Sequence, residues 1–498
     1  MQTSPESRTD RITVIAVRAA VVLSVFAVLT HWHFWDIGPM AFGMNAAVFA
    51  SGILTLQLWV MKHRGVNLRL ILPWTVPLYV IAVGAFLLYE NPFLKAVSVL
   101  VLPVCAAVFL NAAMREQGMR AFWGEGTVLR LAGRALSPVA YVAEAVRRIV
   151  AVLFPVDGKA SLAKRVTAGT AIFLVIAVGI VLPLLGGADP AFAELTDTFL
   201  QWVADLIEPS VAGKILAAIV LTVVLIAVML GWLRPFSQED KGEAAADADS
   251  VITGIVIGGM LLLYAAFLWI QAGRLLVGEL PFDFAAAVYA VKSGFWQLVV
   301  LTLLNITVFV SAYRRTAGPV QRLLLAFAVA SLLLLASAGQ RMALYVINYG
   351  FSYEKFFASY TVLYCAIFLG WLVWHAVKER RADVTRFGAS LFLWMFAALT
   401  VFPVEWSILR ANLALAKRPD TRIRLVEMQM LSPDVLARVQ WLIESGQLEE
   451  PDDSDIRRYG RSFTAPDWSS WIENSAARLD AKPWYERTVS GMINGALR

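Results

Sequence analysis

The chain has 498 residues, of which 59% are hydrophobic and 16% are charged, and its mean hydropathy is +0.66. Soluble domains average about 45–50% apolar and about 25% charged residues, so this composition excludes an ordinary soluble protein and predicts a membrane protein. A net charge of +6 with a pI near 9.3 would suggest nucleic acid in a soluble protein. In a membrane protein the basic residues lie mainly in loops and determine on which side of the membrane each loop is placed, so we expect no nucleic-acid partner.

The apolar residues are grouped in stretches long enough to cross a bilayer as helices, which takes about 20 residues each. The first stretch has the basic flank of a signal peptide but no small-residue cleavage site, so we interpret it as an uncleaved span. The sequence therefore predicts an all-α fold, a polytopic transmembrane helical bundle of about eleven spans. The expected spans are 12–32, 41–61, 70–89, 93–113, 166–186, 214–233, 251–271, 295–313, 320–338, 356–376 and 387–408.

Lysine and arginine are distributed unevenly between the two sets of alternating loops. The segment before the first span and every second loop after it carry most of them, with the densest group between Arg115 and Arg165. Because basic residues accumulate on the cytoplasmic side of a membrane, this pattern predicts that the N-terminus is inside. An odd number of spans then predicts that the C-terminus is outside.

The spans and loops define the predicted regions of the chain. Residues 1–113 form a first four-span membrane unit, and 166–408 form a seven-span membrane unit. Between them, 114–165 is a basic amphipathic cytoplasmic segment, which either lies along the inner leaflet or only determines topology. The outer loop at 187–213 is acidic and amphipathic. Residues 409–498 are more polar and are predicted to form a small helical, extracytoplasmic C-terminal domain.

Helix signals recur within this C-terminal domain. Ser432 and Pro433 are typical of a helix start, and Gly446 is typical of a helix stop. A second helix is expected to begin near Trp468, which shares a helix face with Trp471. We expect the domain to pack on the outer face of the membrane part, with the two tryptophans as candidate partner-binding residues.

Polar residues inside the expected spans are few. Asn45 and Asn305 are the clearest, and we expect each to make an interhelical hydrogen bond. Pro73 and Pro77 lie one turn apart in the third span, which indicates either a kinked helix or a break used for substrate binding. Ionisable residues are missing from mid-span positions, which disfavours proton-coupled transport and ion pumping.

Ionisable residues close to the spans, such as Glu90, Lys95 and Glu405, fall at the outer ends of spans, which we interpret as surface positions. No nucleotide-binding loop, zinc-protease or serine-hydrolase motif occurs. The stretch HWHFWD contains His31 and His33, but alternate residues of a helix diverge, so an aromatic belt is favoured over a metal site. We therefore expect no cofactor, no metal and no catalytic residues, and we favour a non-enzymatic protein.

Polar side chains gather in two outer segments, one after the seventh span and one after the ninth. Tyrosine suits a water–lipid interface, where a cation meets lipid phosphate, so these segments are a candidate lipid- or partner-binding surface. The alternative is an interfacial seat for the C-terminal domain. Tyr345, Tyr349 and Tyr353 would form one stripe on a helix unless Gly350 interrupts it. The candidate residues are Glu279, Asp283 and Lys292 in the first segment and Arg341, Tyr345, Asn348, Tyr349, Tyr353 and Lys355 in the second.

Four motifs in the second half of the chain carry a family resemblance. In order they are AAAVYAVKSGFWQLVVLTLLN, RMALYVINYGFSYEKFFASY, ANLALAKRPDTRIRLVEMQMLSPDVL and DWSSW. With these motifs the chain resembles a bacterial multi-pass membrane protein family of unknown function, domain of unknown function 4173, which is related to 4153. The resemblance implies the bacterial cytoplasmic (inner) membrane, in which the charge pattern above predicts a cytoplasmic N-terminus and an extracytoplasmic C-terminal domain. It implies no established activity.

Three functions stay open at this stage. The first is a non-enzymatic cell-envelope scaffold or sensor with an envelope protein as partner. The second is binding, transport or transfer of a lipid or glycolipid at the outer leaflet, with Arg341 and Lys292 holding a phosphate headgroup. It predicts a groove open to the side between the seventh and eleventh spans. The third is a small-molecule transporter that uses the break at Pro73 and Pro77.

Overall fold

The computed structural model describes residues 5–31, 34–113, 137–153, 209–232, 250–275, 284–313, 316, 318–378, 384–418, 421, 423–448 and 467–496. Within these ranges the regular secondary structure is helical and no strand occurs, which confirms the predicted all-α class. Contacts divide the chain into two compact units. Unit 1 comprises the described residues up to 232 together with 481–492, and unit 2 comprises those from 250 to 480 together with 493–496.

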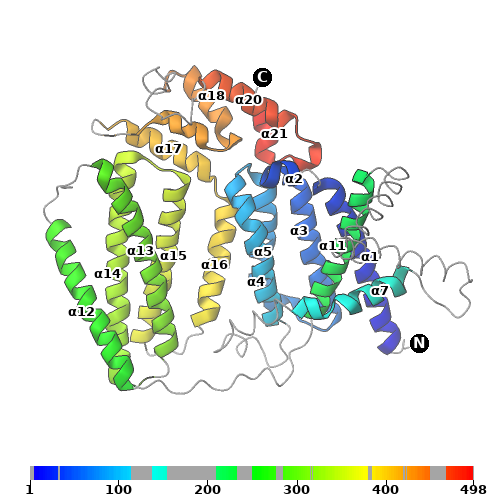
Figure 1. Ribbon diagram of the computed structural model, residues 1–498, viewed down its shortest axis with the longest axis horizontal. Helices are drawn as coiled ribbons and strands as arrows, with labels where there is room; N and C mark the ends of the chain where they lie inside the picture. Colours follow the sequence, from blue (N-terminus) through cyan, green and yellow to red (C-terminus); the bar gives the residue numbers. More distant parts are fainter. Residues whose placement is uncertain are drawn as a thin grey trace, which may run out of the picture. The chain divides into compact units, whose positions relative to one another are not determined.

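Unit 1 is built from long, apolar helices (Figure 1). They are α1 (Pro5–His31), α3 (Met44–His63), α4 (Leu68–Val83), α5 (Pro92–Ala113) and α11 (Pro209–Trp232). Two short elements, α2 (Phe34–Ile37) and η1 (Gly38–Ala41), connect α1 with α3. The amphipathic helix α7 (Val142–Leu153) packs against α1 and α11, and its Arg148 reaches toward Thr13 near the start of α1. This helix belongs to the segment that the sequence predicts to be basic and amphipathic.

Small and polar residues hold the helices of unit 1 close together. A Cβ at Gly52 of α3 would lie only 2.6 Å from Leu23 of α1, so glycine permits this approach. Asn45, near the start of α3, donates from Nδ2 to the Thr30 carbonyl of α1 at 2.7 Å and accepts at Oδ1 from Gly43 N at 2.8 Å. The interhelical hydrogen bond expected for Asn45 is therefore confirmed.

The two prolines of the third predicted span do not break it. Pro73 and Pro77 both lie inside α4, which runs without interruption from Leu68 to Val83 and continues as a π-helical turn over Gly84–Leu88. The structure thus favours the kinked helix over a discontinuous one, because neighbouring helices and local adjustments tolerate proline in a membrane helix.

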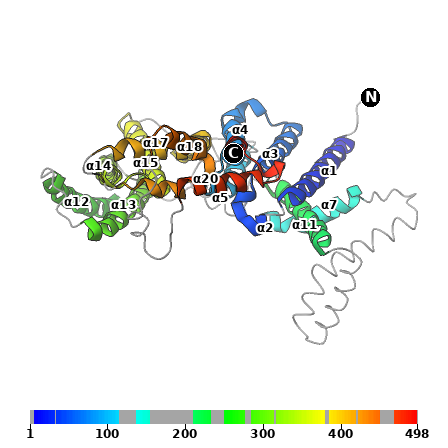
Figure 2. The same cartoon turned by 90° about the horizontal axis from the view of Figure 1, so that it is seen from above.

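Unit 2 contains a second bundle of long helices. They are α12 (Ser250–Leu275), α13 (Phe284–Ala312), α14 (Gly318–Tyr349), α15 (Tyr353–Val377) and α16 (Val384–Val401). Shorter elements follow, and α17 and α18 lie across the end of this bundle where α14 stops and α15 begins (Figures 1 and 2). The shorter elements are α17 (Val404–Ala416), η6 (Leu425–Met430), η7 (Pro433–Val435), α18 (Leu436–Glu444) and α20 (Trp468–Asp480). The last two elements of the chain are η8 (Trp484–Glu486) and α21 (Val489–Gly495).

The core of unit 2 is apolar around one polar network. Phe327 of α14 is fully buried and stacks on Tyr264 of α12. The Tyr264 hydroxyl donates to Asn305 Oδ1 of α13 at 2.7 Å, and Asn305 Nδ2 donates to Ser331 Oγ of α14 at 2.9 Å. The interhelical role predicted for Asn305 is confirmed, and one buried amide joins three helices.

The described residues contain nine helices that are long and apolar enough to cross a membrane. They correspond to nine of the expected spans, while the apolar stretch of α13 over Val299–Ala312 is shorter and 166–186 lies outside the described residues. α14 is 32 residues long, or about 48 Å at about 1.5 Å per residue, which exceeds the roughly 30 Å apolar core of a bilayer. The predicted span 387–408 ends earlier, at Val401, because Pro403 follows and cannot continue the helix.

The predicted C-terminal domain is helical, but contacts do not separate 409–498 as a unit of its own. The local signals are confirmed: Ser432 Oγ accepts from Asp434 N at the start of η7, and Gly446, with φ of +68°, follows the end of α18. α20 begins at Trp468 as expected. The outer loop 187–213 lies outside the described residues except for the start of α11, and so does most of 114–165.

Candidate functional site

Unit 1 contains an apolar cavity of about 550 Å³. Pockets for small molecules typically measure about 300–1,000 Å³, so its size suits a ligand. Along α3 its walls run from Ala46 to Gln57, which spans about 16 Å of helix axis. Within the described ranges no aspartate, glutamate, lysine or arginine lines it, and His31, Gln57 and Ser98 are its polar residues. The lining residues are Ala27, Val28, His31, Phe42, Ala46, Phe49, Ala50, Ile53, Leu54, Gln57, Phe86, Ser98, Val99, Leu102, Pro103, Ala106, Ala217, Leu221, Leu225 and Val228.

Aromatic side chains close one end of the cavity. The ring of Phe42 lies 5.8 Å from His31 and 5.7 Å from Phe86, and His31 lies 5.9 Å from Phe49. On the side of α5, Val99 is 42% exposed, so this wall meets the outside of the bundle. The cavity is therefore bounded by aromatic rings near Phe42, and its α5 wall reaches the surface of unit 1.

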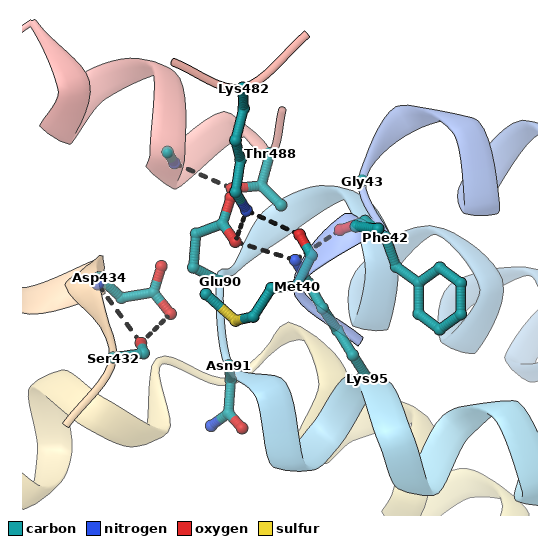
Figure 3. Close-up of polar contacts among 12 residues, drawn as sticks. Met40, Phe42, Gly43, Glu90, Asn91, Lys95, Ser432, Asp434, Lys482 and Thr488 are labelled. Carbon is teal, nitrogen blue, oxygen red and sulfur yellow. Dashed lines mark hydrogen bonds and ion pairs between the residues drawn. The ribbon is translucent and has the colours of Figure 1, made fainter. Parts of the chain in front are cut away.

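A buried ionic cluster lies behind Phe42. Lys95 Nζ donates to the Phe42 carbonyl at 2.6 Å and to Glu90 Oε2 at 3.0 Å (Figure 3). Lys482 Nζ donates to the same Glu90 oxygen at 2.7 Å and to the Met40 carbonyl at 2.9 Å. Glu90 and Lys95 are 0% exposed. Two ammonium groups thus pair with one carboxylate in the interior. Buried ions are tolerated only when each of them is also hydrogen-bonded, as Glu90, Lys95 and Lys482 are here.

The local sequence explains how Glu90 and Lys95 come together. Asn91 accepts a hydrogen bond from Leu94 N, and Pro92 occupies the first helical position, so α5 begins directly after Glu90. Lys95 then lies one turn into the helix and reaches back to Glu90. Burial raises the pKa of Glu90, but the charges of Lys95 and Lys482 and their hydrogen bonds outweigh burial and hold the pKa below its ordinary value.

The C-terminal segment 481–492 completes this cluster from the far end of the chain. Thr488 Oγ1 donates to Glu90 Oε1 at 2.9 Å, and Met44 N donates to the Arg487 carbonyl at 3.2 Å. A Cβ on Gly43 would lie only 2.2 Å from the Glu486 carbonyl oxygen, so the backbones meet here directly. The segment therefore holds residues 40–44, which carry the Phe42 wall of the cavity.

Unit 2 contains a second buried glutamate, in a different setting. Glu405, near the start of α17, is 3% exposed and hydrogen bonds through Oε1 with the hydroxyl of Tyr353. Its Oε2 accepts from Ser432 N at 2.9 Å, and Ser432 Oγ donates to Asp434 Oδ2 at 2.8 Å (Figure 3). Burial, followed by the negative charge of Asp434, raises the pKa of Glu405 to about 8. Glu405 is thus a neutral carboxyl at neutral pH that joins the 425–435 segment to α15 and α17.

The polar stretch 341–360 forms the end of α14, a turn and the start of α15. Gly350, with φ of +71°, ends α14, so the three tyrosines do not form one stripe. Tyr345 and Tyr349 stack with ring centroids 5.4 Å apart, whereas Tyr353 belongs to α15. Asn412 of α17 pairs with the turn, because its Oδ1 accepts from Phe351 N at 2.6 Å and its Nδ2 donates to the Phe351 carbonyl at 2.9 Å.

The cations predicted to hold a phosphate contact protein groups. Lys355 Nζ donates to the carbonyls of Gly350 at 2.6 Å and Tyr349 at 3.2 Å, and it lies 4.3 Å from the centre of the Tyr345 ring. It therefore caps the C-terminus of α14, where a positive charge favours the helix dipole. The guanidinium of Arg341 lies over the ring of Phe267 at 6.0 Å. Asn348 Nδ2 donates to the Leu344 carbonyl of its own helix.

The remaining predicted binding residues are either buried or outside the part of the chain that the structure describes. Trp468 and Trp471 are 1% and 8% exposed and pack edge to face, so in this structure they are interior residues of the C-terminal part. The role in partner binding expected for these two tryptophans stays a prediction. Glu279 and Asp283 lie outside the described residues, and Lys292 belongs to α13 but its side chain is not described.

A groove does open between the helices that the lipid hypothesis names. It measures about 520 Å³ and lies between α14, α15 and α17 in unit 2. Met342, Val346 and Phe351 are among its lining residues, and none of the candidates whose side chains the structure describes lines it. Among the residues that the structure describes, no three histidine, cysteine, aspartate or glutamate side chains come together as a metal site requires.

The fold and these sites define an integral membrane protein with several apolar spans. The chain belongs to the family described as Domain of unknown function (DUF4153), which matches residues 75–440, nearly three quarters of its length. This agrees with the related family expected from the motifs, while the link to family 4173 stays a prediction. No curated protein and no solved structure matches the chain.

Sequence reasoning missed the groups that shape the cavity. Gln57 and Ser98 stand inside otherwise apolar spans, which is a visible signal, since such positions usually have a partner or a function. Glu90 and Lys95 were assigned to the surface, but both are buried. Their position on either side of an Asn-Pro helix start is the signal that relates them.

Proposed function

We propose that the protein binds a lipid of the surrounding bilayer in the unit 1 cavity, with an apolar chain between α1, α3, α5 and α11. The observation that carries this proposal is the cavity of about 550 Å³ within membrane-spanning helices, lined without charged residues. A site of this kind favours an apolar chain and disfavours an ion or a polar metabolite. The lipid hypothesis from the sequence is thus retained, but its site moves from unit 2 to unit 1.

The bilayer is the source of the ligand because the cavity reaches the outside of the bundle through α5. Val99 and Pro103 line it and are exposed, and the apolar phase of a membrane surrounds that face of a spanning helix. A lipid chain enters there without crossing water. The opposite end is closed by Phe42, which the cluster of Glu90, Lys95 and Lys482 holds in place.

The arrangement of charges in unit 1 supports an orientation with the N-terminus inside. Arg64, Arg147 and Arg148 lie at the end of the unit where α1 begins and α3 stops. The C-terminal segment 481–492 contacts the other end, at residues 40–44 and Glu90. With basic residues on the cytoplasmic side, the closed end near Phe42 belongs to the outer leaflet.

The test is native mass spectrometry of the protein extracted with its own membrane lipid, with Ala106→Leu and Ala96→Leu as a matched pair on α5. Ala106 lines the cavity and is 4% exposed, whereas Ala96 is exposed and does not line it. We expect wild type and Ala96→Leu to retain a lipid and Ala106→Leu to lose it. Leu225→Phe, on the α11 wall, repeats the test if Ala106→Leu does not fold. Equal retention in all variants, or none in wild type, contradicts the proposal.

A sensor of pH is the second candidate, and Glu405 is the observation that favours it. Its carboxyl joins α15 and α17 to the segment before α18, and its pKa of about 8 lies within the physiological range. Ionisation would bring a second negative charge beside Asp434. This candidate gives the sensor hypothesis a specific residue, and the Glu405→Gln experiment below tests it.

A further inference from the structure

We infer that the ligand of the unit 1 cavity is an uncharged amphiphile whose hydroxyl group lies deep between the helices, where it donates to Oε1 of Gln57 of α3 and accepts from Oγ of Ser98 of α5. This inference rests on the proposed lipid-binding function and specifies the chemical class of the lipid. It differs from a phospholipid, whose charged headgroup stays at the membrane surface.

The first observation is that both side chains line the cavity and that each has one buried polar atom without a partner among the described residues. Gln57 is 3% exposed and Ser98 is 0% exposed. Within the described part of the chain, Gln57 Oε1 and Ser98 Oγ are buried without a hydrogen-bond partner. Buried polar groups are nearly always hydrogen-bonded, so two unpartnered ones in the wall of one cavity indicate a missing ligand group.

The second observation is that the Ser98 hydroxyl does not make the hydrogen bond that other hydroxyls in these helices make to their own backbone. Ser24, Thr55 and Thr222 each donate to the carbonyl four residues earlier, at 2.7–2.8 Å. This bond normally satisfies a serine or threonine inside a helix. Ser98 has the same opportunity at Leu94 and does not use it. Its hydroxyl proton is therefore not taken up by its own helix.

The charge of the site selects a neutral ligand. Among the described residues, the cavity wall contains no acidic or basic side chain apart from His31, whose Nδ1 already contacts the Ala27 carbonyl and Thr30 Oγ1. The ammonium groups of Lys95 and Lys482 lie behind Phe42 and are paired with Glu90. An anionic group in the cavity would meet no counter-charge from these residues, whereas a hydroxyl group can donate to Gln57 Oε1 and accept from Ser98 Oγ.

The experiment uses the full chain in lipid nanodiscs and a photoreactive diazirine derivative of hexadecanol, with labelled peptides mapped by mass spectrometry. The variants are Gln57→Leu and Ser98→Ala, and the control is Thr55→Val, which removes a partnered hydroxyl on the outside of α3. We expect labelling of α3 and α5 to fall about five-fold in each cavity variant and to stay at the wild-type level in the control, since one hydrogen bond is worth about that factor. Competition should be stronger with hexadecanol than with hexadecane or hexadecanoate.

The outcomes separate this inference from the proposed function. Equal labelling of wild type and both cavity variants, or equal competition by hexadecane, overturns the inference but leaves chain binding in place. Absence of labelling at α3 and α5 with every probe overturns both. The variants should unfold at the same temperature as wild type or higher, because they remove unpartnered polar groups. A clear loss of stability would mean that Gln57 and Ser98 have partners within the fold, and would also overturn the inference.

Discussion

Glu90 of unit 1 and Glu405 of unit 2 are both buried next to helix ends, and the two are in opposite states. Glu90 faces two ammonium groups, which keep its pKa below the ordinary value despite burial. Glu405 faces a second carboxylate, that of Asp434, and its pKa rises to about 8. Burial is nearly complete in both cases, so the sign of the neighbouring charge decides whether the buried carboxyl is ionised.

The comparison also separates two ways of holding a chain segment on a helical bundle. In unit 1 an ionised carboxylate holds residues 481–492 through Lys482 and Thr488, and this bond is independent of pH near neutrality. In unit 2 a neutral carboxyl holds the 425–435 segment through Ser432. The first arrangement suits a permanent wall behind the cavity, and the second suits a contact that responds to pH.

The largest effect is expected from removing the carboxylate of Glu90. Glu90→Leu leaves Lys95 buried at 0% exposure without its counter-charge, which should destabilise the protein by about 3–5 kcal/mol. The measurement is reversible unfolding in mixed micelles. The control is Glu144→Gln on α7, whose two arginine partners lie at the surface, and it should cost about 0–1 kcal/mol.

A double variant sharpens this prediction. Adding Lys95→Met to Glu90→Leu replaces the two fully buried ions by apolar groups and leaves Lys482, whose side chain is 9% exposed, so stability should recover substantially. If Glu90→Leu alone is as stable as Glu144→Gln, the cluster is not the buried ion pair described here. Failure of the double variant to recover any stability would instead point to the hydrogen bonds of Lys95 with the Phe42 carbonyl.

The second prediction concerns the pH dependence of Glu405. The pKa is raised from an ordinary value of 4.5 to about 8, so the folded contact binds a proton that the unfolded chain releases. Its contribution to stability is complete below about 4.5 and is lost as pH rises through about 8, by roughly 2 kcal/mol or more. The protection of residues 425–435 against hydrogen exchange should therefore fall over this range of pH.

Glu405→Gln tests the assignment, because the amide stays neutral at every pH. The variant should keep its protection of 425–435 at high pH, whereas wild type loses it. Asp434→Asn should lower the pH at which wild-type protection is lost, since it removes the neighbouring negative charge. If the wild-type profile is flat between about pH 5 and 9, the sensor function is excluded.

The sequence was informative wherever the deciding contacts were local. Long apolar stretches predicted the nine helices, Ser432 and Gly446 predicted the limits of a C-terminal helical turn and helix, and a lone asparagine predicted an interhelical bond. The burial of the two glutamates was not predictable, because it depends on partners that are distant in the sequence. Lys482 lies 392 residues from Glu90, and Ser432 lies 27 residues from Glu405. Without those partners both glutamates resemble surface residues at the ends of spans, which is how they were interpreted.

The smallest expected effect compares the two lysines, Lys95 and Lys355. Lys95 pairs with a buried carboxylate, whereas Lys355 donates to the last carbonyls of α14 and lies beside the Tyr345 ring. A cation at a helix C-terminus is typically worth about 0.3–1 kcal/mol, so Lys355→Met should cost no more than that in the same unfolding assay. Lys355→Arg should restore most of the loss, because it keeps the charge. If Lys355→Met instead leaves stability unchanged but removes a co-purifying anionic lipid, the lysine holds a headgroup, as the sequence suggested, and unit 2 contains a lipid site of its own.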